Sequence, residues 1–253
     1  FKNVGETKPS KRLTKQHKIV NQGISAELIA NKWGFSRRQL DEYAYQSHQL
    51  ALSAIEKGHY ADEIVPIKVT DENGEGKIVD VDEGPRPETT IDILSELQPV
   101  FKKGGKITAG NSSQMSDGAS AVLLMSKEKA DELGLKQKAK IVARSVVGSD
   151  PTLMLTGPIE ATRQVLKKAN VSLVDIARYE VNEAFAPIPL AWLHDLQADV
   201  EKLNVNGGAI ALGHPLGATG TKLLVSLMNE LDRIEGKYGL LAICEGMGMA
   251  NAT

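Results

Sequence analysis

The sequence predicts an α/β protein with a layered sheet in its second half, and two observations carry this prediction. From about residue 106 onward, short apolar runs alternate with segments of helical periodicity, a pattern typical of sheets covered by helices. The first 105 residues differ, because they are mainly helical and include one long polar loop. A chain of 253 residues fits one large domain or two small ones.

Residues 1–20 are polar and basic, with little apolar periodicity. The pattern favours a solvated, flexible arm, and the alternative is a patch that attracts phosphates. The basic residues include Lys8, Lys11, Arg12, Lys15, His17 and Lys18. The first regular element is a short helix predicted over 25–33, which Gly34 ends.

A longer helix is predicted from Ser36 to about Lys57. Ser36 and Gln39 have the spacing of a capping box, in which the serine oxygen accepts one orphan N–H and the glutamine bonds back to the serine N–H. Gly58 ends the helix. Its apolar residues recur at helical spacing and form one stripe: Leu40, Tyr43, Ala44, Leu50, Ala51, Ala54 and Ile55.

After this helix we predict an edge strand over 64–69, because Pro66 has no N–H group to donate to a neighbouring strand. A loop rich in Asp, Glu, Gly and Pro follows over 70–90. Residues 119–125 are an apolar run, which we predict to be a buried strand. Further strands are predicted over 140–147, 179–181 and 239–243, with a last strand near Thr253. Helices are predicted over 90–97, 127–133, 158–168, 172–177, 184–196 and 220–233.

Composition excludes several classes of function. The formal net charge of −2 does not favour nucleic acid or an anionic membrane surface as a partner. No apolar run approaches the roughly 18–20 residues of a membrane span, so we expect no membrane partner. The single cysteine, Cys244, excludes an internal disulfide and fits a reducing compartment, either the cytoplasm or an organelle matrix.

The segment 204–220 holds five glycines and one histidine, His214, between Gly213 and Pro215. Glycine lets the backbone approach a ligand closely, and proline fixes the chain after the histidine. The following helix offers N–H groups and a positive dipole end. A phosphate-cradling loop is disfavoured, since neither G-x-x-x-x-G-K-[ST] nor G-x-G-x-x-G is present. A purely structural histidine is the other alternative.

Two more segments place polar groups after predicted strands. Asn182-Glu183-Ala184-Phe185-Ala186 stands at a strand-to-helix turn, where side chains point into the crevice that binds ligands; the alternative is helix capping by Asn182. Cys244-Glu245-Gly246-Met247-Gly248 follows the strand 239–243. A thiol beside bare glycine N–H groups can combine an acid/base group with oxyanion donors, and the alternative is a buried inert cysteine.

In this order and spacing, the three segments resemble the thiolase family. The segment 204–220 is similar to its second signature, 182–185 to its NEAF motif, and 244–246 to its Cys-x-Gly motif. Upstream, 109–113 with 117–119 resembles its AGN-x-S…DGA stretch, and Met154 with Gly157-Pro158 resembles its Met-x-x-Gly-Pro turn. The resemblance covers nearly everything from about residue 21 to residue 253.

The resemblance implies a thiolase-like fold with a mixed sheet flanked by helices and an inserted loop domain. On this basis 1–105 is the loop domain, 106–136 is the last segment of the N-terminal half, and 137–253 is the C-terminal half. The implied activity is thiolytic cleavage of 3-ketoacyl-CoA, or Claisen condensation of two acyl-CoA molecules. Coenzyme A and acyl-CoA are then substrates, with no covalently bound cofactor and no metal, and the parent enzyme is a dimer or tetramer.

The resemblance also implies roles for single residues. His214 activates a nucleophile and donates to a thioester oxygen, and Asn182 holds a water that completes this oxyanion hole. Cys244 exchanges a proton with the α-carbon, which a thiol pKa of about 8.5 would suit. Gly246 lends an N–H to a second oxyanion hole. Residues implied to contact the substrate or coenzyme A are Ser113, Met154, Phe185 and, near the nucleotide, Arg86.

Two departures from the family pattern stand out. The motif of the family is Cys-x-Gly-Gly-Gly-x-Gly. In this chain Met247 replaces the middle glycine and Ala250 replaces the last, and this difference bears on acyl specificity. The family's nucleophilic cysteine belongs to a segment that would precede Phe1, and Phe1 is not a start methionine. We therefore expect the C-terminal two-thirds of a thiolase, inactive by itself.

A module that holds CoA esters without turnover is the rival hypothesis. A decarboxylating ketoacyl synthase is disfavoured, because it uses two histidines where this chain has His214 and Cys244.

Overall fold

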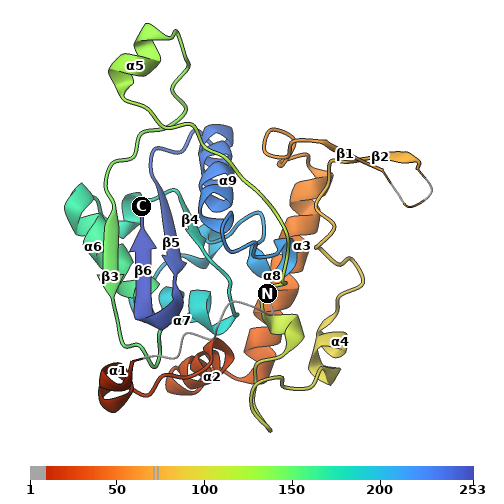
Figure 1. The fold of residues 1–253 in the computed structure, drawn as a ribbon, viewed down its shortest axis with the longest axis vertical. Coiled ribbons are helices and arrows are strands. Elements are labelled where there is room, and N and C mark those ends of the chain that lie inside the picture. Colours follow the sequence, from red (N-terminus) through yellow and green to blue (C-terminus); the bar gives the residue numbers. More distant parts are fainter. Residues whose placement is uncertain (1–9, 71, 73) are drawn as a thin grey trace.

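The computed structural model describes residues 10–70, 72 and 74–253. At its centre lies a four-stranded mixed sheet (Figure 1). The middle strand β6 is antiparallel to both neighbours, and β5 is parallel to β4. The α/β class and the mixed sheet expected from the sequence are therefore confirmed. The strand order is β3 (Ser145–Gly148), β6 (Met249–Ala252), β5 (Gly239–Cys244) and β4 (Arg178–Val181).

Helices cover both faces of this sheet. In β5, Leu240 and Ala242 pack in one core cluster with side chains of α6 and α7, whereas Leu241 packs against α9. Successive strand residues point to opposite faces, so α9 lies on one face and α6 with α7 on the other. The helix bounds are α6 (Gly157–Ala169), α7 (Pro187–Leu196) and α9 (Thr219–Arg233). All three had been predicted within a few residues.

A second layer of helices packs over the end of the sheet where β4 and β5 finish. Here α2 packs on α7, and α3 packs on α4 and α8. The capping box of α3 forms as predicted, because Ser36 Oγ accepts from the Gln39 N–H at 3.2 Å and Gln39 Oε1 accepts from the Ser36 N–H at 2.8 Å. The bounds are α2 (Gln22–Lys32), α3 (Arg37–Glu56), α4 (Ile91–Glu96) and α8 (Ala209–Leu212).

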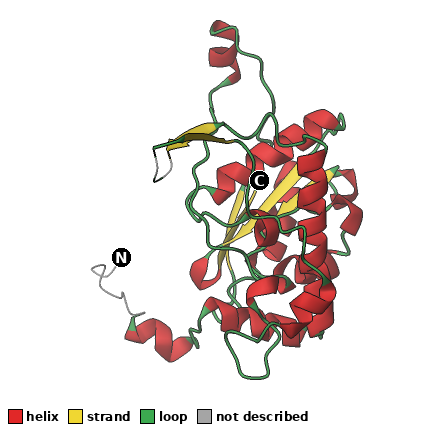
Figure 2. Ribbon diagram, turned by 90° about the vertical axis from the view of Figure 1, so that its right-hand side faces the viewer, coloured by secondary structure: helices red, strands yellow, loops and turns green. Residues whose placement is uncertain are grey.

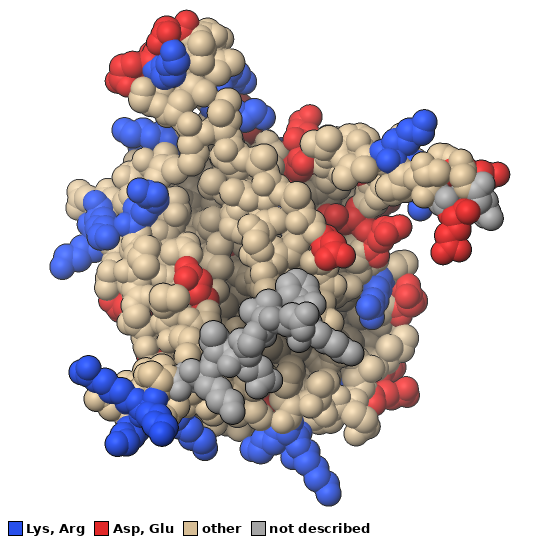
Figure 3. All heavy atoms as spheres, in the orientation of Figure 1, with Lys and Arg blue, Asp and Glu red and all other residues tan. Residues whose placement is uncertain are grey.

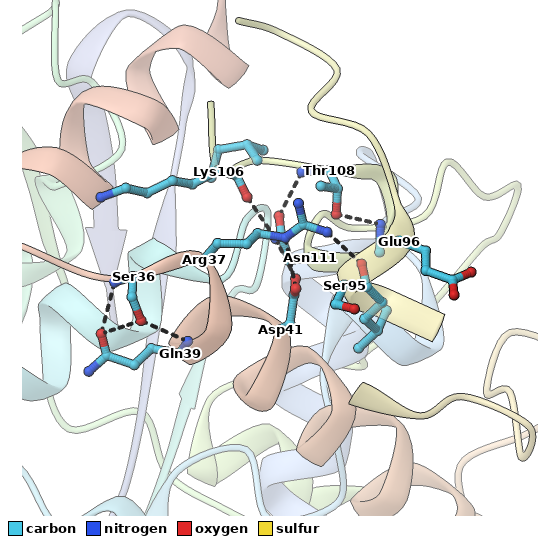
Figure 4. Close-up of polar contacts among 12 residues, drawn as sticks. Ser36, Arg37, Gln39, Asp41, Ser95, Glu96, Lys106, Thr108 and Asn111 are labelled. Atoms are coloured by element: carbon cyan, nitrogen blue, oxygen red, sulfur yellow. Dashed lines mark hydrogen bonds and ion pairs between the residues drawn. The ribbon is translucent and has the colours of Figure 1, made fainter. Parts of the chain in front are cut away.

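A buried polar cluster ties the segment after residue 105 to α3 (Figure 4). Asp41 is 1% exposed, and its two oxygens accept from Arg37 Nε at 2.7 Å and from Asn111 Nδ2 at 2.9 Å. Asn111 Oδ1 accepts from the Thr108 N–H at 2.9 Å, and Asn111 Nδ2 also donates to Lys106 O at 3.0 Å. This cluster fixes the start of the strand-like segment 112–114, which reaches the candidate site.

The hairpin of β1 (Ile67–Thr70) and β2 (Gly76–Val79) corrects two predictions. The first strand begins only after Pro66, and β2 lies in the segment predicted as loop. The two strands pair with each other and not with the main sheet, so Pro66 has no central ladder to interrupt. Their residues are almost all exposed, and Figure 2 shows the hairpin projecting from the helices.

The predicted buried strand over 119–125 is wrong. The segment carries no regular structure, and Leu123 and Leu124 are 76% and 67% exposed. It runs past α9, where Ser120 Oγ donates to Ala218 O at 2.7 Å, and on to the projecting helix α5 (Lys127–Glu132) (Figure 1). The physical reason is that a strand requires a partner, and no strand of the described residues lies beside this one.

Smaller differences concern the ends of elements. Residues 11–16, expected to be a flexible arm, form the exposed helix α1 (Lys11–Gln16), because Ser10 caps it by accepting from the Leu13 N–H at 3.2 Å. Figure 3 shows the basic side chains that gather there; the rest of the predicted arm, residues 1–9, lies outside the described residues. The strand predicted from 140 begins at Ser145. Within the described residues, no helix has the length and apolarity to cross a membrane.

Replacing Asn111 with alanine tests the polar cluster. Asn111→Ala should lower the free energy of unfolding by about 2–3 kcal/mol, because it leaves a carboxylate oxygen of Asp41 and the Thr108 N–H buried without partners. Urea denaturation followed by circular dichroism measures the change. The control, Asn31→Ala on the exposed side of α2, should cost less than about 0.5 kcal/mol. Equal losses for the two variants would contradict the role given to the cluster.

Candidate active site at the ends of two strands

A cavity of about 250 Å³ lies where β4 and β5 end. Three of the predicted catalytic residues, His214, Cys244 and Gly246, contribute to its wall. Apolar side chains, Gly220 and three polar side chains complete it. The lining residues are Gln22, Leu155, Ala184, His214, Leu216, Thr219, Gly220, Ile243, Cys244, Glu245 and Gly246.

His214 is held by its backbone and by its ring. Its N–H donates to Gln114 O at 3.0 Å, and Pro215 follows it directly. The preceding Gly213 has a φ of 84°, and a Cβ there would lie 2.0 Å from Ser116 Oγ, so only glycine fits. The ring's Nδ1 lies 2.6 Å from Thr219 Oγ1. The histidine therefore has one fixed orientation, with Nε2 turned away from Thr219.

Asn182 links the histidine to the sheet. It follows β4, and its N–H donates to Ala242 O at 3.1 Å, which continues the pairing of β4 with β5. Its Nδ2 lies 3.3 Å from His214 Nε2. Asn182 does not cap α7, since Ala186 occupies that position. Its Oδ1 is buried without a hydrogen-bond partner among the described residues, a state that is common at sites that receive a ligand or water.

Cys244 ends β5 and is 8% exposed. Burial raises the pKa of its thiol to about 12, and the negative charge of Glu245 adds to the rise. A hydrogen bond from Asn182 opposes the rise. The pKa of about 8.5 expected from the sequence is therefore corrected, because the thiol lies in a low-dielectric site. Cys244 is neutral near neutral pH and can give up a proton only to a strong base.

The turn after Cys244 carries backbone strain. Met247 has a φ of 65°, in the left-handed region, and is the residue that replaces a glycine of the family pattern. Such a conformation costs a residue with a Cβ about 1–2 kcal/mol. The next residue, Gly248, has a φ of 90°. A Cβ there would lie 2.7 Å from Ser149 O. The turn keeps Gly246 in the wall of the cavity, while the Met247 side chain is 42% exposed.

Positive charge and burial keep the histidine neutral. Burial lowers the pKa of His214, and the charge of Lys222 on α9 lowers it further. Lys222 is itself enclosed, and burial lowers its pKa as well. Nearby, burial raises the pKa of Glu180 well above its usual value, and the charge of Glu183 adds to this. An unprotonated His214 near neutral pH is suited to act as a base.

The predicted substrate-binding residues do not line the cavity. Met154 and Phe185 are buried in the core cluster beside it, and the Phe185 ring packs edge-on against Phe101 with centroids 5.8 Å apart. Ser113 donates its N–H to Ala184 O at 3.0 Å. Arg86 is exposed, and its N–H donates to His48 Nδ1 at 3.1 Å. Their contacts with a substrate remain predictions.

Several residues of the site escaped the sequence analysis. Gln22, at the start of α2, lines the cavity from the other half of the chain. Gln114 holds the glycine-rich segment, because its Nε2 donates to Ile210 O at 3.0 Å and Ala211 O at 2.9 Å. Thr219 bonds the histidine ring. Only Thr219 gave a sequence signal, since it stands one turn after His214 at the start of a helix.

A cysteine that ends β5 and a histidine that follows α8 share one cavity, with a buried asparagine beside the histidine, and this arrangement is suited to proton transfer to and from a ligand. The sequence comparisons identify the family of the chain. The thiolase N-terminal domain matches residues 2–128, and the thiolase C-terminal domain matches residues 135–253. The chain belongs to the thiolase family.

Its relatives are longer than the chain itself. The steroid 3-ketoacyl-CoA thiolase of Mycobacterium tuberculosis is 48% identical over 241 residues, which cover 94% of this chain and 58% of the relative. The 3-ketoacyl-CoA thiolase of Bacillus subtilis is also 48% identical over 241 residues, covering 92% of this chain and 62% of the relative. The chain thus spans about three-fifths of these relatives.

Solved structures agree with this assignment. The crystal structure of the Bacillus anthracis acetyl-CoA acetyltransferase matches with a TM-score of 0.89 and 43% identity, over 93% of this chain and 59% of that one. The human mitochondrial 3-ketoacyl-CoA thiolase in complex with coenzyme A matches with a TM-score of 0.89 and 44% identity, over 92% of this chain and 58% of that one. The predicted family and fold are confirmed.

The raised pKa of Cys244 predicts slow alkylation of the folded chain. Iodoacetamide reacts with the thiolate. At about pH 8, the thiolate population of a thiol with a pKa of about 12 is on the order of 10³ smaller than that of an unfolded cysteine. Mass spectrometry of samples with and without urea gives the two rates. Equal rates in the folded and unfolded chain would contradict the burial and the pKa assigned to Cys244.

Proposed function

We propose that these residues form the acid–base part of an enzyme that cleaves 3-ketoacyl-CoA by thiolysis, or that runs the reverse condensation of two acyl-CoA molecules. The observation that carries the proposal is that His214 and Cys244 share the wall of one cavity, with the Asn182 amide nitrogen 3.3 Å from His214 Nε2. The relatives' names, 3-ketoacyl-CoA thiolase and acetyl-CoA acetyltransferase, agree with this. So does the coenzyme A bound to the human relative.

In the cleavage direction, Cys244 acts as the acid. When the bond between the α-carbon and the 3-carbonyl carbon breaks, its electron pair forms an enolate on the departing acyl-CoA. The neutral thiol of Cys244 then gives its proton to the α-carbon and becomes a thiolate. A thiol with a pKa of about 12 holds this proton until the enolate forms. The N–H of Gly246, in the same wall, stabilises the oxyanion of the thioester.

His214 acts on the acyl-accepting nucleophile. Its Nε2 takes the nucleophile's proton, and the resulting Nε2–H donates a hydrogen bond to the thioester oxygen. Asn182, whose amide nitrogen lies beside Nε2, holds a water that completes this oxyanion hole. Ser113, Met154 and Phe185 shape the acyl and pantetheine pocket, and Arg86 contacts the nucleotide part of coenzyme A.

The remaining parts of the proposal concern the whole protein. We divide the chain into a loop domain over 1–105, the end of the N-terminal half over 106–136, and the C-terminal half over 137–253. The whole enzyme forms dimers or tetramers, and it works in the cytoplasm or an organelle matrix, where its thiols stay reduced.

A polypeptide of these 253 residues alone should show no thiolysis. Cys244 is its only cysteine, and that thiol is buried and neutral, so no covalent acyl intermediate forms. The test mixes the chain with acetoacetyl-CoA and coenzyme A and follows both turnover and intact mass. Turnover, or an acyl adduct on Cys244, would contradict the proposal. Calorimetry with coenzyme A separately tests whether the chain binds the substrate without turning it over.

Two substitutions separate the roles in a protein that joins these residues to the family's acyl-accepting cysteine. His214→Ala should abolish acylation of that cysteine, whereas Cys244→Ala should spare acylation and slow carbon–carbon cleavage. Each loss should be on the order of 10²–10⁴ in rate. Rapid quench with mass detection measures the acyl-enzyme. The control, His194→Ala, changes an exposed histidine of α7 and should keep the full rate. An unaltered overall rate in Cys244→Ala would remove Cys244 from the mechanism.

A further inference from the structure

The ring of His214 makes one contact at each nitrogen, and the two contacts differ in kind. Nδ1 lies 2.6 Å from the hydroxyl oxygen of Thr219, whose side chain belongs to a residue that is 3% exposed. Nε2 lies 3.3 Å from the amide nitrogen of Asn182. A neutral imidazole carries its proton on only one nitrogen, so the partners decide which nitrogen is basic.

The hydroxyl proton of Thr219 already has an acceptor. Thr219 Oγ1 donates to Pro215 O at 3.0 Å, one helical turn back. That carbonyl is fixed in place, because it also accepts the backbone N–H groups of Ala218 at 2.8 Å and Thr219 at 2.9 Å. A hydroxyl has one proton and two lone pairs. Toward His214, Thr219 Oγ1 is therefore an acceptor, and Nδ1 must carry the proton.

The contact at the other nitrogen requires the same tautomer. The amide nitrogen of Asn182 can only donate, so His214 Nε2 must present its lone pair to it. In the opposite tautomer, Thr219 would have to leave Pro215 O, and an Nε2–H would face another N–H group. Two independent contacts thus select the same protonation state of one ring.

We propose that Thr219 is a positioning residue whose hydroxyl holds His214 as the Nδ1–H tautomer and so keeps Nε2 as the base that faces Asn182. The consequence for catalysis rests on the proposed function, whereas the tautomer is a property of the folded chain. When Nε2 takes a proton, Nδ1–H stays on Thr219, so the ring keeps the hydrogen bond that orients it.

A hydroxyl differs from the carboxylate that holds the histidine in Ser-His-Asp sites. It orients the ring without adding negative charge, so it does not stabilise the imidazolium as an ion pair would. Burial and the charge of Lys222 lower the pKa of His214. The neutral hydroxyl of Thr219 adds no charge that would raise this pKa again. The structure thereby combines a fixed tautomer with a ring that is unprotonated near neutral pH.

Nuclear magnetic resonance measures the tautomer directly, without any need for activity. Long-range ¹H–¹⁵N correlation of the ¹⁵N-histidine-labelled chain at about pH 8, where a histidine is neutral, distinguishes a protonated ring nitrogen from an unprotonated one. The chain has five histidines, and His214→Gln identifies the signals of His214. The expected result is a protonated Nδ1 and an unprotonated Nε2. A protonated Nε2 in the unmodified chain would overturn the proposal.

Two substitutions at one position separate the hydroxyl from the shape of the side chain. Thr219→Val keeps the volume and removes the hydroxyl, and it should shift the tautomer ratio of His214 toward Nε2–H by about tenfold, the effect of one hydrogen bond. Thr219→Ser keeps the hydroxyl and should keep the tautomer. The matched control, Thr221→Val, removes a hydroxyl of α9 that bonds Ala218 O at 3.1 Å and should change nothing at His214.

The outcomes decide the proposal and leave the proposed function separately testable. The role of Thr219 is rejected if the folded Thr219→Val chain keeps the tautomer of His214. It is also rejected if Thr219→Ser loses the Nδ1–H tautomer. If Thr219→Val does not fold, the unmodified chain and Thr219→Ser still give a decision. Failure of this proposal would leave the acyl transfer of the whole enzyme untouched, because that is read from turnover and not from the ring nitrogens.

Discussion

The arrangement of the site depends on the buried carboxylate of Glu183, which is 1% exposed. One of its oxygens accepts from the Tyr43 hydroxyl at 2.8 Å and from Asn204 Nδ2 at 3.0 Å. The other accepts from Ser47 Oγ at 2.7 Å and from the Ile210 N–H at 3.1 Å. A charge taken out of water is tolerated only when its lone pairs are satisfied in this way. The four donors come from α3 and from the glycine-rich segment, so one group joins the first half of the chain to the second.

This constraint explains the glycines better than contact with a ligand does. A Cβ on Gly208 would lie 2.2 Å from Glu183 Cδ, and one on Gly207 would lie 2.7 Å from Ala51 Cβ of α3. The segment must therefore have no side chain where it crosses the carboxylate and the helix. Gln114 donates hydrogen bonds to the next turn of this segment, and His214 follows directly after that turn. His214 is thus placed by groups that do not line the cavity, and its position depends on them.

Much of the molecule could be predicted from local signals, and the failures share a cause. The capping box of α3 and the helix opened by Pro158 were predictable, because their partners lie within a few residues along the chain. The strand predicted over 119–125 was wrong, because the same apolar residues fit both a buried strand and an unpaired segment beside α9. The strand β2 was missed because its four residues, Gly-Lys-Ile-Val, are almost all exposed and do not alternate between apolar and polar.

The sequence by itself singled out the candidate residues of the site, because His214, Asn182 and Cys244 each stand in a motif of local residues that resembles the thiolase family. Only the tertiary structure decided their state. Burial raised the pKa of Cys244 to about 12, folding placed His214 and Cys244 in the wall of one cavity with Asn182 beside His214, and the contact of Nδ1 with Thr219 fixed the orientation of the ring. Solvation and hydrogen-bond partners depend on residues distant in the chain, such as Gln22 and Gln114, and local sequence patterns do not record them.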